Sequence, residues 1–213
     1  MRFEHSLFGK IMEPISRREF ESISARHKGD HRVRRFRCWE WMTALIFAQL
    51  SGASSLRDLE SSLNSLAQHH YHWGGLKGVR RSTFADANNT RPWEILADVC
   101  GKLFNLCAGY AGEGKEILRL IDSSPIPLRQ SCYDWAEESS RVKGLSLHTV
   151  YDPVSGLPTQ FAISGAKTPD VKMGQTLIKP EQGATYVFDK GYCDYNWWWS
   201  LQQATENWTG ASL

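Results

Sequence analysis

The sequence predicts an α+β protein in which a helical N-terminal region is followed by a mixed β-sheet. Two observations support this fold class. Between Cys38 and Leu106, apolar residues recur at three- and four-residue steps, which is the period of an amphipathic helix. After Gly114, apolar residues gather instead in short runs between turn residues, which is typical of strands. We therefore expect two domains, residues 1–112 and residues 113–213.

Two helices are predicted first in the N-terminal domain. Cys38–Leu50 predicts a buried helix that ends at Gly52. Ser55–Asp58 fits a capping box and opens an amphipathic helix with leucines at regular steps. This pair resembles a helix-turn-helix in outline, although many helical pairs share that outline without binding DNA. Further along, Ser82 is a candidate N-cap, and Pro92 suits the first turn of another helix.

The C-terminal domain is predicted from a run of short elements in a fixed order. The first element is a strand at residues 117–121, followed by a two-stranded hairpin at 144–151 and 157–164. A helix at 170–177, a strand at 184–188 and a final helix at 194–204 complete the order. The hairpin turn is Asp152–Gly156, a good turn sequence. This order matches the opening of a ribonuclease-H-like domain, in which a mixed sheet carries acids at its strand ends.

Charge is divided unevenly between the two halves of the chain. Residues 1–91 hold 15 Lys and Arg against 9 Asp and Glu, whereas residues 92–213 hold 10 against 14. A basic N-terminal half favours a polyanion as partner, although uneven surface charge without a partner is the alternative. The candidate DNA-binding residues are Arg32, Arg34, Arg35, Arg37, Lys77, Arg80 and Arg81.

Several classes of protein are disfavoured by composition. The longest apolar stretch, Met42–Leu50, is too short to span a bilayer, and no apolar secretory signal is visible at the N-terminus. Five cysteines without a C-x-x-C pair predict reduced thiols in a cytoplasmic protein rather than a disulfide or zinc framework. The histidines between His69 and His72 fit a solvated loop better than a metal site, because no Cys or acid nearby completes a ligand set.

Two aspartates follow apolar strand-like runs and are the candidate catalytic and metal-binding residues. Asp122 ends the run Ile117–Ile121, and Asp189 ends the run Ala184–Phe188. Phosphodiester chemistry commonly uses two Mg²⁺ ions that clamp the attacking and leaving oxygens, and carboxylates are suitable ligands for Mg²⁺. Acids at strand ends are also frequent turn residues and helix caps, and that reading stays open for both.

Other polar residues of this half are predicted to have structural roles. Asp134, Asp152 and Asp170 are expected to be turn or cap residues. His148 alternates with apolar residues in a strand, so a packed or hydrogen-bonded histidine is expected rather than a ligand or base. The run Trp197–Trp199 could stack on DNA bases. At least one of the three is expected in the core, because three successive helical positions point in different directions.

Several local strings resemble one family when taken in order. Arg80–Asn88 followed by Arg91-Pro92 resembles a stretch of bacterial insertion-sequence transposases of the IS-four type. Ile121-Asp122-Ser123 and Val187–Tyr192 resemble the first and second catalytic motifs of that family of DDE transposases. The resemblance implies a cut-and-paste transposase. Its helices would bind the terminal inverted repeats of an element, and Asp122 and Asp189 would hold Mg²⁺ for DNA cleavage and strand transfer.

The resemblance also implies features that this sequence does not show. The family's third acid lies in a Tyr-x-x-Arg-x-x-x-Glu-x-x-x-x-x-x-Lys signature, which does not occur here. We therefore expect a C-terminally truncated copy that lacks the last sheet strand, the insertion and the third acid. Its partners would be double-stranded DNA and a second or full-length transposase chain, with the nucleoid as its location. The alternatives are a non-catalytic DNA-binding regulator of transposition and an unrelated ribonuclease-H-like nuclease.

Overall fold

The computed structural model describes residues 7–66, 78–108, 117–128, 143–205 and 211–212. The chain divides into two compact units, Met1–Leu103 and Phe104–Leu213, which we describe separately. The domain boundary predicted at residues 112 and 113 lies outside the described residues and stays a prediction. The histidine loop and Asp134 also lie outside them.

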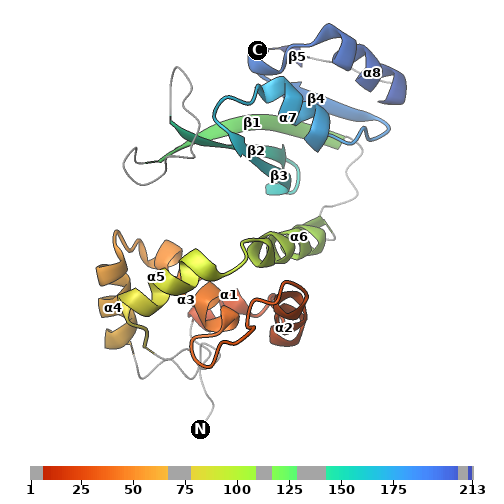
Figure 1. Cartoon of the computed structure of the whole chain (residues 1–213). Coiled ribbons are helices and arrows are strands. Elements are labelled where there is room, and N and C mark those ends of the chain that lie inside the picture. The colour runs from red at the N-terminus through yellow and green to blue at the C-terminus, as the bar shows by residue number, and fades with distance from the viewer. Residues whose placement is uncertain (1–6, 67–77, 109–116, 129–142, 206–210, 213) are drawn as a thin grey trace. The chain divides into compact units, whose positions relative to one another are not determined.

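The first unit is helical, as predicted. Its elements are α1 (Leu7–Met12), α2 (Arg17–Arg26), α3 (Cys38–Ser51), α4 (Leu56–Ser65), α5 (Arg81–Thr90) and α6 (Glu94–Ala108), the last of which continues past Leu103 (Figure 1). α3 ends where Gly52 adopts a left-handed conformation with a φ of 67°, a geometry that glycine adopts without steric cost. α4 begins at the predicted cap, where the Ser55 hydroxyl accepts a hydrogen bond of 3.1 Å from the Asp58 amide.

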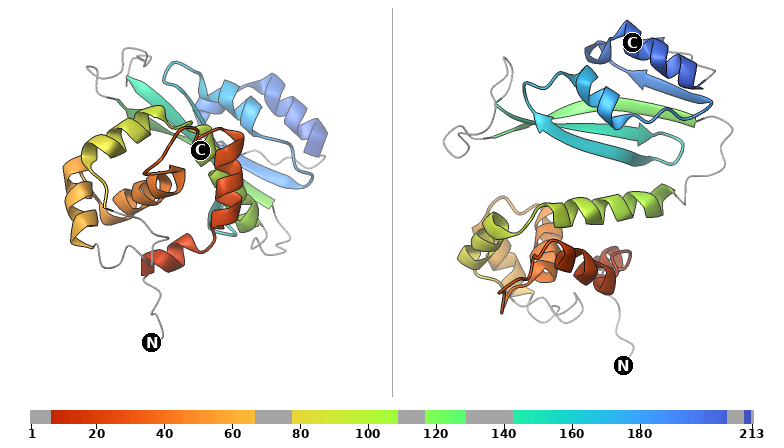
Figure 2. Two further views of the ribbon diagram at one scale, coloured as in Figure 1. Left: turned by 60° about the horizontal axis from the view of Figure 1, so that its bottom comes forward. Right: turned by 45° about the vertical axis from the view of Figure 1, so that its right-hand side comes forward.

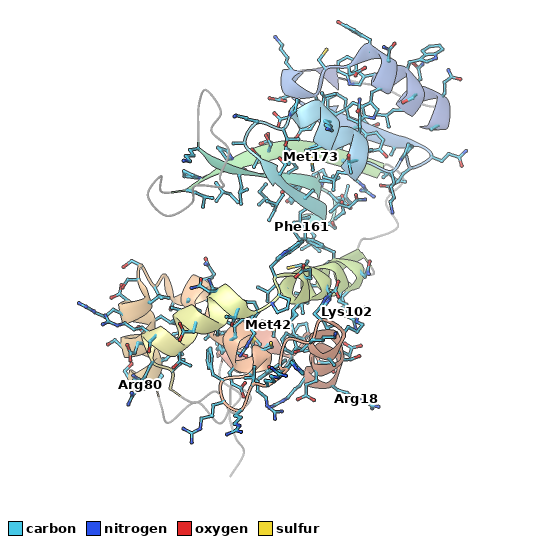
Figure 3. All side chains as sticks on the ribbon, in the orientation of Figure 1. Arg18, Met42, Arg80, Lys102, Phe161 and Met173 are labelled. Atoms are coloured by element: carbon cyan, nitrogen blue, oxygen red, sulfur yellow. The ribbon has the colours of Figure 1, made fainter. Side chains whose placement is uncertain are left out.

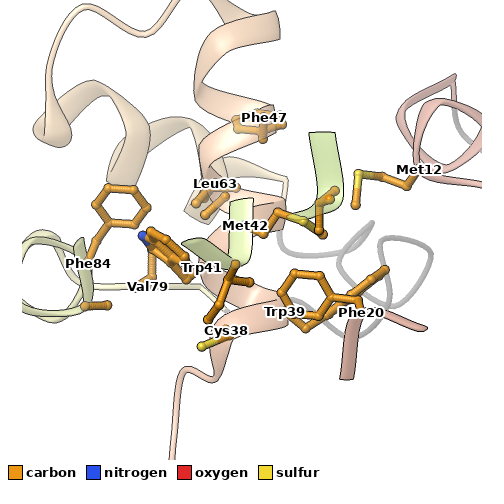
Figure 4. Packing of buried hydrophobic residues seen from close by; sticks show 14 of the residues in the cluster. Met12, Phe20, Cys38, Trp39, Trp41, Met42, Phe47, Leu63, Val79 and Phe84 are labelled. Atoms are coloured by element: carbon orange, nitrogen blue, oxygen red, sulfur yellow. The ribbon is translucent and has the colours of Figure 1, made fainter. Parts of the chain in front are cut away.

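The core of this unit is built around α3, which is apolar on most of its sides (Figure 4). Trp39 packs edge-on against Phe20 of α2, with ring centroids 5.4 Å apart. Trp41 lies near Val79 and Phe84, so α3 joins the N-terminal helices to the segment that opens α5. A helix that is buried on nearly every side needs apolar residues on all of those sides and not on one face only. The sequence of α3 is therefore a nearly continuous apolar run.

Two predictions about helix starts in this unit need correction. α5 begins at Arg81 with Arg80 at the N-cap position, so Ser82 lies inside the first turn and is not the cap. α6 begins at Glu94, two residues after Pro92, so the proline precedes the helix. Both errors come from choosing the start by residue type alone, while neighbouring positions can also provide the extended backbone of a cap.

The second unit contains a five-stranded mixed sheet with the order β3-β2-β1-β4-β5. The strands are β1 (Ile117–Pro127), β2 (Gly144–Asp152), β3 (Leu157–Gly165), β4 (Ala184–Phe188) and β5 (Ala211–Ser212). β1, β2 and β3 pair antiparallel, whereas β4 is parallel to both β1 and β5. This arrangement, with α7 (Asp170–Leu177) between β3 and β4 and α8 (Tyr195–Thr205) after β4, confirms the predicted α+β fold with a partial ribonuclease-H-like domain.

One face of the sheet is covered by α7 and α8 (Figure 2). Val150, Ile121 and Phe188 lie next to one another in register across β2, β1 and β4, and all three are buried. Phe188 stacks on Trp197 of α8 with ring centroids 5.7 Å apart. Trp197 is buried while Trp199 is 63% exposed, which confirms that part of the tryptophan run belongs to the core.

The sheet differs from the prediction at two strands. β1 does not stop at Ile121 but continues through Asp122 to Pro127, because its distal half pairs with β2. The last strand was expected to be missing, yet Ala211 and Ser212 form β5 beside Val187 and Phe188 of β4.

Within the described residues, no helix is both long enough and apolar enough to cross a membrane.

Candidate active site and nucleic-acid interface

The parallel pairing of β1 and β4 brings the two predicted aspartates to adjacent positions. Its last pair is Ile121 with Phe188, so Asp122 and Asp189 are the next residues along each strand. Neighbouring strands are about 4.8 Å apart, so the two backbone positions are close. Beyond this point β1 continues beside β2, while the chain after β4 turns away into a short 3-10 helix, Lys190–Tyr192. The end of the parallel pairing, rather than the end of β1, therefore locates the site.

Each aspartate uses one carboxylate oxygen locally and leaves the other open. Asp122 Oδ1 accepts a hydrogen bond of 2.8 Å from the Ser123 amide, and Asp189 Oδ1 accepts one of 2.9 Å from the Gly191 amide. Both residues are exposed, and neither Oδ2 atom has a hydrogen-bond partner among the described residues. Asp189 is thus the cap of the 3-10 helix, as the alternative reading allowed, and still has an oxygen available for a ligand.

A third carboxylate, Asp170, lies beside Asp189. A methyl group added to Gly191 would meet Asp170 Oδ2 and Asp189 Oδ1, each at 3.0 Å, so both oxygens lie close to the position that a side chain would occupy here. Asp170 was predicted to be a turn or cap residue, but it is the first residue of α7 and Pro169 occupies the N-cap position without a side-chain cap. Sequence spacing gave no sign of this contact, because it depends on how α7 packs against the segment after β4.

Two buried polar side chains, Tyr192 and His148, lie next to this group of carboxylates. His148 is fully buried, with Nε2 2.9 Å from the Ser164 hydroxyl and Nδ1 3.4 Å from the Tyr192 hydroxyl and 3.7 Å from Asp170 Oδ1. Burial lowers the pKa of His148, with Asp170 partly opposing the shift, so a neutral imidazole is favoured. The prediction of a packed, hydrogen-bonded histidine is confirmed.

The pKa of Tyr192 is raised by its surroundings. Burial raises this pKa most, and the negative charges of Asp170, Asp122 and Asp189 raise it further. All three carboxylates are therefore near enough for their charges to act on the Tyr192 hydroxyl. Even so, no three His, Cys, Asp or Glu side chains in the described part of the chain come together closely enough to hold a metal ion. The oxygen atoms present suit Mg²⁺ in kind, but the described set is incomplete in number.

A basic hollow on the helical unit collects most of the predicted DNA-binding residues. It has a volume of about 770 Å³, and its lining includes Arg34, Arg35, Arg37 and Arg80. All four arginines are exposed, and Figure 3 shows Arg80 at the surface of the unit. Arg32 and Arg81 are exposed but do not line this hollow, and Lys77 lies outside the described residues.

The arginines of the hollow differ from the basic residues of α2 and α6. Arg17, Arg26 and Lys102 lie 3.0–3.2 Å from the carboxylates of Glu21, Asp98 and Glu19. In contrast, no ion pair within 4.0 Å joins any arginine of the hollow to a carboxylate of the described residues. The four arginines of the hollow outnumber Glu40, the one carboxylate among its described lining residues, and the resulting positive charge favours binding a polyanion.

Comparisons with known proteins agree with the geometry of the sheet. Residues 113–209 match the family model described as "Transposase DDE domain". These residues are therefore similar to a transposase DDE domain. Residues 4–75 match a second model, described as "Domain of unknown function (DUF4372)". The chain is also 45% identical over 125 residues to the "Putative transposase y4zB" of Sinorhizobium fredii (strain NBRC 101917 / NGR234), in an alignment covering 56% of this chain and 33% of the relative.

These matches confirm the resemblance to insertion-sequence DDE transposases, while the IS-four subtype stays a prediction. The chain spans about a third of the length of the S. fredii relative. The matched residues 113–209 contain β1, β4 and both candidate aspartates.

Proposed function

We propose that this chain is a metal-dependent DNA transposase that binds the terminal inverted repeats of a mobile element and acts on its DNA strands. The carrying observation is the register of β1 and β4 within the DDE domain, which places Asp122 beside Asp189 with one free oxygen on each. Carboxylates so placed suit a divalent cation, and we propose Mg²⁺.

In this proposal the two aspartates hold the cation and the neighbouring groups keep them in position. A bound divalent cation supplies charge neutralisation at a phosphate and an activated oxygen nucleophile. The Ser123 and Gly191 amides fix the orientation of the Asp122 and Asp189 carboxylates. Asp170, between His148 and Gly191, adds a negative charge beside Asp189 and favours retention of the cation.

Calorimetric titration with Mg²⁺ or Mn²⁺ tests the metal part of this proposal. We expect Asp122→Asn and Asp189→Asn each to weaken binding by about tenfold or more, since each removes one charged ligand. Asp194→Asn is the matched control, because both of its oxygens already accept hydrogen bonds, one of 3.0 Å from the Trp197 amide and one of 3.3 Å from Gln175 Nε2. Equal affinities in the parent chain and both site variants would refute the assignment.

For DNA, we propose that Arg34, Arg35, Arg37 and Arg80, with Arg32, Arg81 and Lys77, contact the phosphates of double-stranded DNA. Removing one phosphate-binding cation lowers the slope of log affinity against log salt by roughly 0.9. We expect Arg34→Gln with Arg35→Gln to reduce that slope by about 2 on inverted-repeat DNA. The control, Arg17→Gln with Arg26→Gln, removes the same charge from arginines already paired on α2. Equal slopes for the two double variants would exclude the hollow as the DNA-binding surface.

A second candidate function is a DNA-binding regulator that occupies element ends or pairs with a full-length transposase. The observation in its favour is that the described residues bring no third metal ligand to Asp122 and Asp189. We propose accordingly that this chain alone transfers no strands in Mg²⁺ or Mn²⁺. Strand transfer that disappears in Asp189→Ala would contradict this. Co-expression with an intact transposase separates the two functions, since a regulator changes the transposition frequency.

A further inference from the structure

The basic hollow of the helical unit contains one carboxylate that the phosphate-binding role leaves unexplained. Glu40, in the first turn of α3, lines the hollow together with the four arginines. Its Oε2 atom is buried and has no hydrogen-bond partner among the described residues. No arginine lies within 4.0 Å of it in an ion pair there either. A buried acceptor without a donor is unfavourable, and Glu40 lines the hollow, so a rotation of this side chain toward a donor brought by a ligand would relieve the cost.

The form of the hollow indicates which part of a nucleic acid could bring that donor. Double-stranded DNA is read by elements that project into its grooves, such as a helix or a two-stranded ribbon. A concave site cannot enter a DNA groove in this way. The volume of this hollow, about 770 Å³, instead falls within the roughly 300–1,000 Å³ of pockets that enclose small ligands. An unstacked nucleotide offers a base to such a pocket while its phosphates stay at the rim.

The lining of the hollow matches the parts of a nucleotide. The exposed guanidinium groups of Arg34, Arg35 and Arg80 suit phosphate oxygens, which they can bind with two hydrogen bonds. Val79 and Phe36 add apolar surface for a base. Glu40 can only accept hydrogen bonds when ionised, so it suits a base with an exocyclic amino group, as in cytosine, adenine and guanine. Thymine has no exocyclic amino group, and its one donor on that edge, N3–H, lies between two carbonyl oxygens that a carboxylate repels.

We propose that this hollow binds one unstacked nucleotide whose base has an exocyclic amino group. The arginines hold the flanking phosphates, and Glu40 accepts a hydrogen bond from the amino group of the base. The inference rests on the proposed DNA binding by the helical unit. It adds a base preference that phosphate contacts alone do not provide.

Fluorescence anisotropy with short single strands tests the inference on the full chain. The probes are labelled hexathymidylate and the same strand with one central cytosine. We expect the cytosine strand to bind about tenfold more tightly, the discrimination that one good base contact provides. In Glu40→Met this preference should disappear while binding to hexathymidylate becomes tighter, because a negative charge is removed from among the arginines.

Two further variants keep the result interpretable. Glu21→Met makes the same charge change on α2, where Glu21 pairs with Arg17 outside the hollow, and should keep the preference. Glu40→Gln retains a carbonyl acceptor and should keep part of the preference, provided that its circular dichroism matches the parent chain. A parent chain that binds duplex DNA but shows no cytosine preference overturns this inference alone. A chain that binds neither strand nor duplex overturns the proposed DNA binding as well.

Discussion

The two ends of the central sheet treat their carboxylates in opposite ways. At one end, Arg119 of β1 lies 3.4 Å from Asp152 and 2.8 Å from Glu181, and Asp152 also accepts a hydrogen bond of 2.9 Å from the Val154 amide. At the other, Asp122 and Asp189 have no cationic partner within 4.0 Å among the described residues. We call the first end the complete end, because its carboxylates already have a guanidinium partner. We call the second the open end, because its carboxylates are free to bind a cation.

This difference shows what separates a structural acid from a candidate ligand. Asp152 is the last residue of β2 and Asp189 directly follows β4, and each precedes a turn. Asp152 is only 5% exposed, however, and its carboxylate is satisfied by the turn and by Arg119. Asp189 is exposed with one oxygen free. Both aspartates lie at a strand end, so that position does not distinguish them. Whether each is structural or a candidate ligand is decided by the burial of its carboxylate and by the groups bound to it.

Removing the positive charge of Arg119 from the complete end should have the largest effect, and that effect is on stability. Arg119→Met leaves the buried Asp152 carboxylate without its counter-charge, and we expect the free energy of unfolding to fall by about 3 kcal/mol. Denaturant unfolding measures this, with Lys179→Met, an exposed residue, as the control for charge. Arg119→Met combined with Asp152→Leu should recover part of that stability. A single variant as stable as the parent chain would mean that the ion pair contributes nothing.

A smaller effect is expected from crowding the open end. Gly191→Ala places a methyl group 3.0 Å from both Asp170 Oδ2 and Asp189 Oδ1, so these carboxylates must move apart. We expect Mg²⁺ affinity to fall by about tenfold while the melting temperature changes little. Gly101→Ala is the control, because a methyl group there meets nothing within 4 Å. Unchanged affinity in Gly191→Ala would show that this local geometry does not affect the cation.

The smallest effect concerns pH at the complete end. Burial tends to raise the pKa of Asp152, but hydrogen bonds from Val154 and Ser155 and the charge of Arg119 lower it overall. A lowered folded-state pKa stabilises the protein above the unfolded-state value of about 3.9, and this contribution is lost as pH falls through the folded-state pKa. Urea unfolding between pH 2 and 6 should therefore show Asp152→Asn approaching the parent chain in stability on acidification. A constant difference would contradict the assignment.

Local patterns predicted most elements of this chain correctly. The starts of α3 and α7 and both bounds of β4 agree with the prediction. The apolar period, the left-handed Gly52 and the Ser55 cap are interactions within a few residues, so they can be read from the sequence. The end of β1 and the existence of β5 were wrong because each depends on a pairing partner distant in sequence.

For the candidate sites, the sequence by itself determined which chemistry is available. It supplied two aspartates after apolar runs and a cluster of arginines before α3. Only the tertiary structure decided which side chains meet. The parallel register set Asp122 beside Asp189, the packing of α7 brought Asp170 to Gly191, and the fold of the helical unit left one Glu40 oxygen buried in a hollow lined by arginines. Residue type fixes charge and hydrogen-bonding capacity, whereas proximity and burial arise from contacts between distant segments, which no local pattern contains.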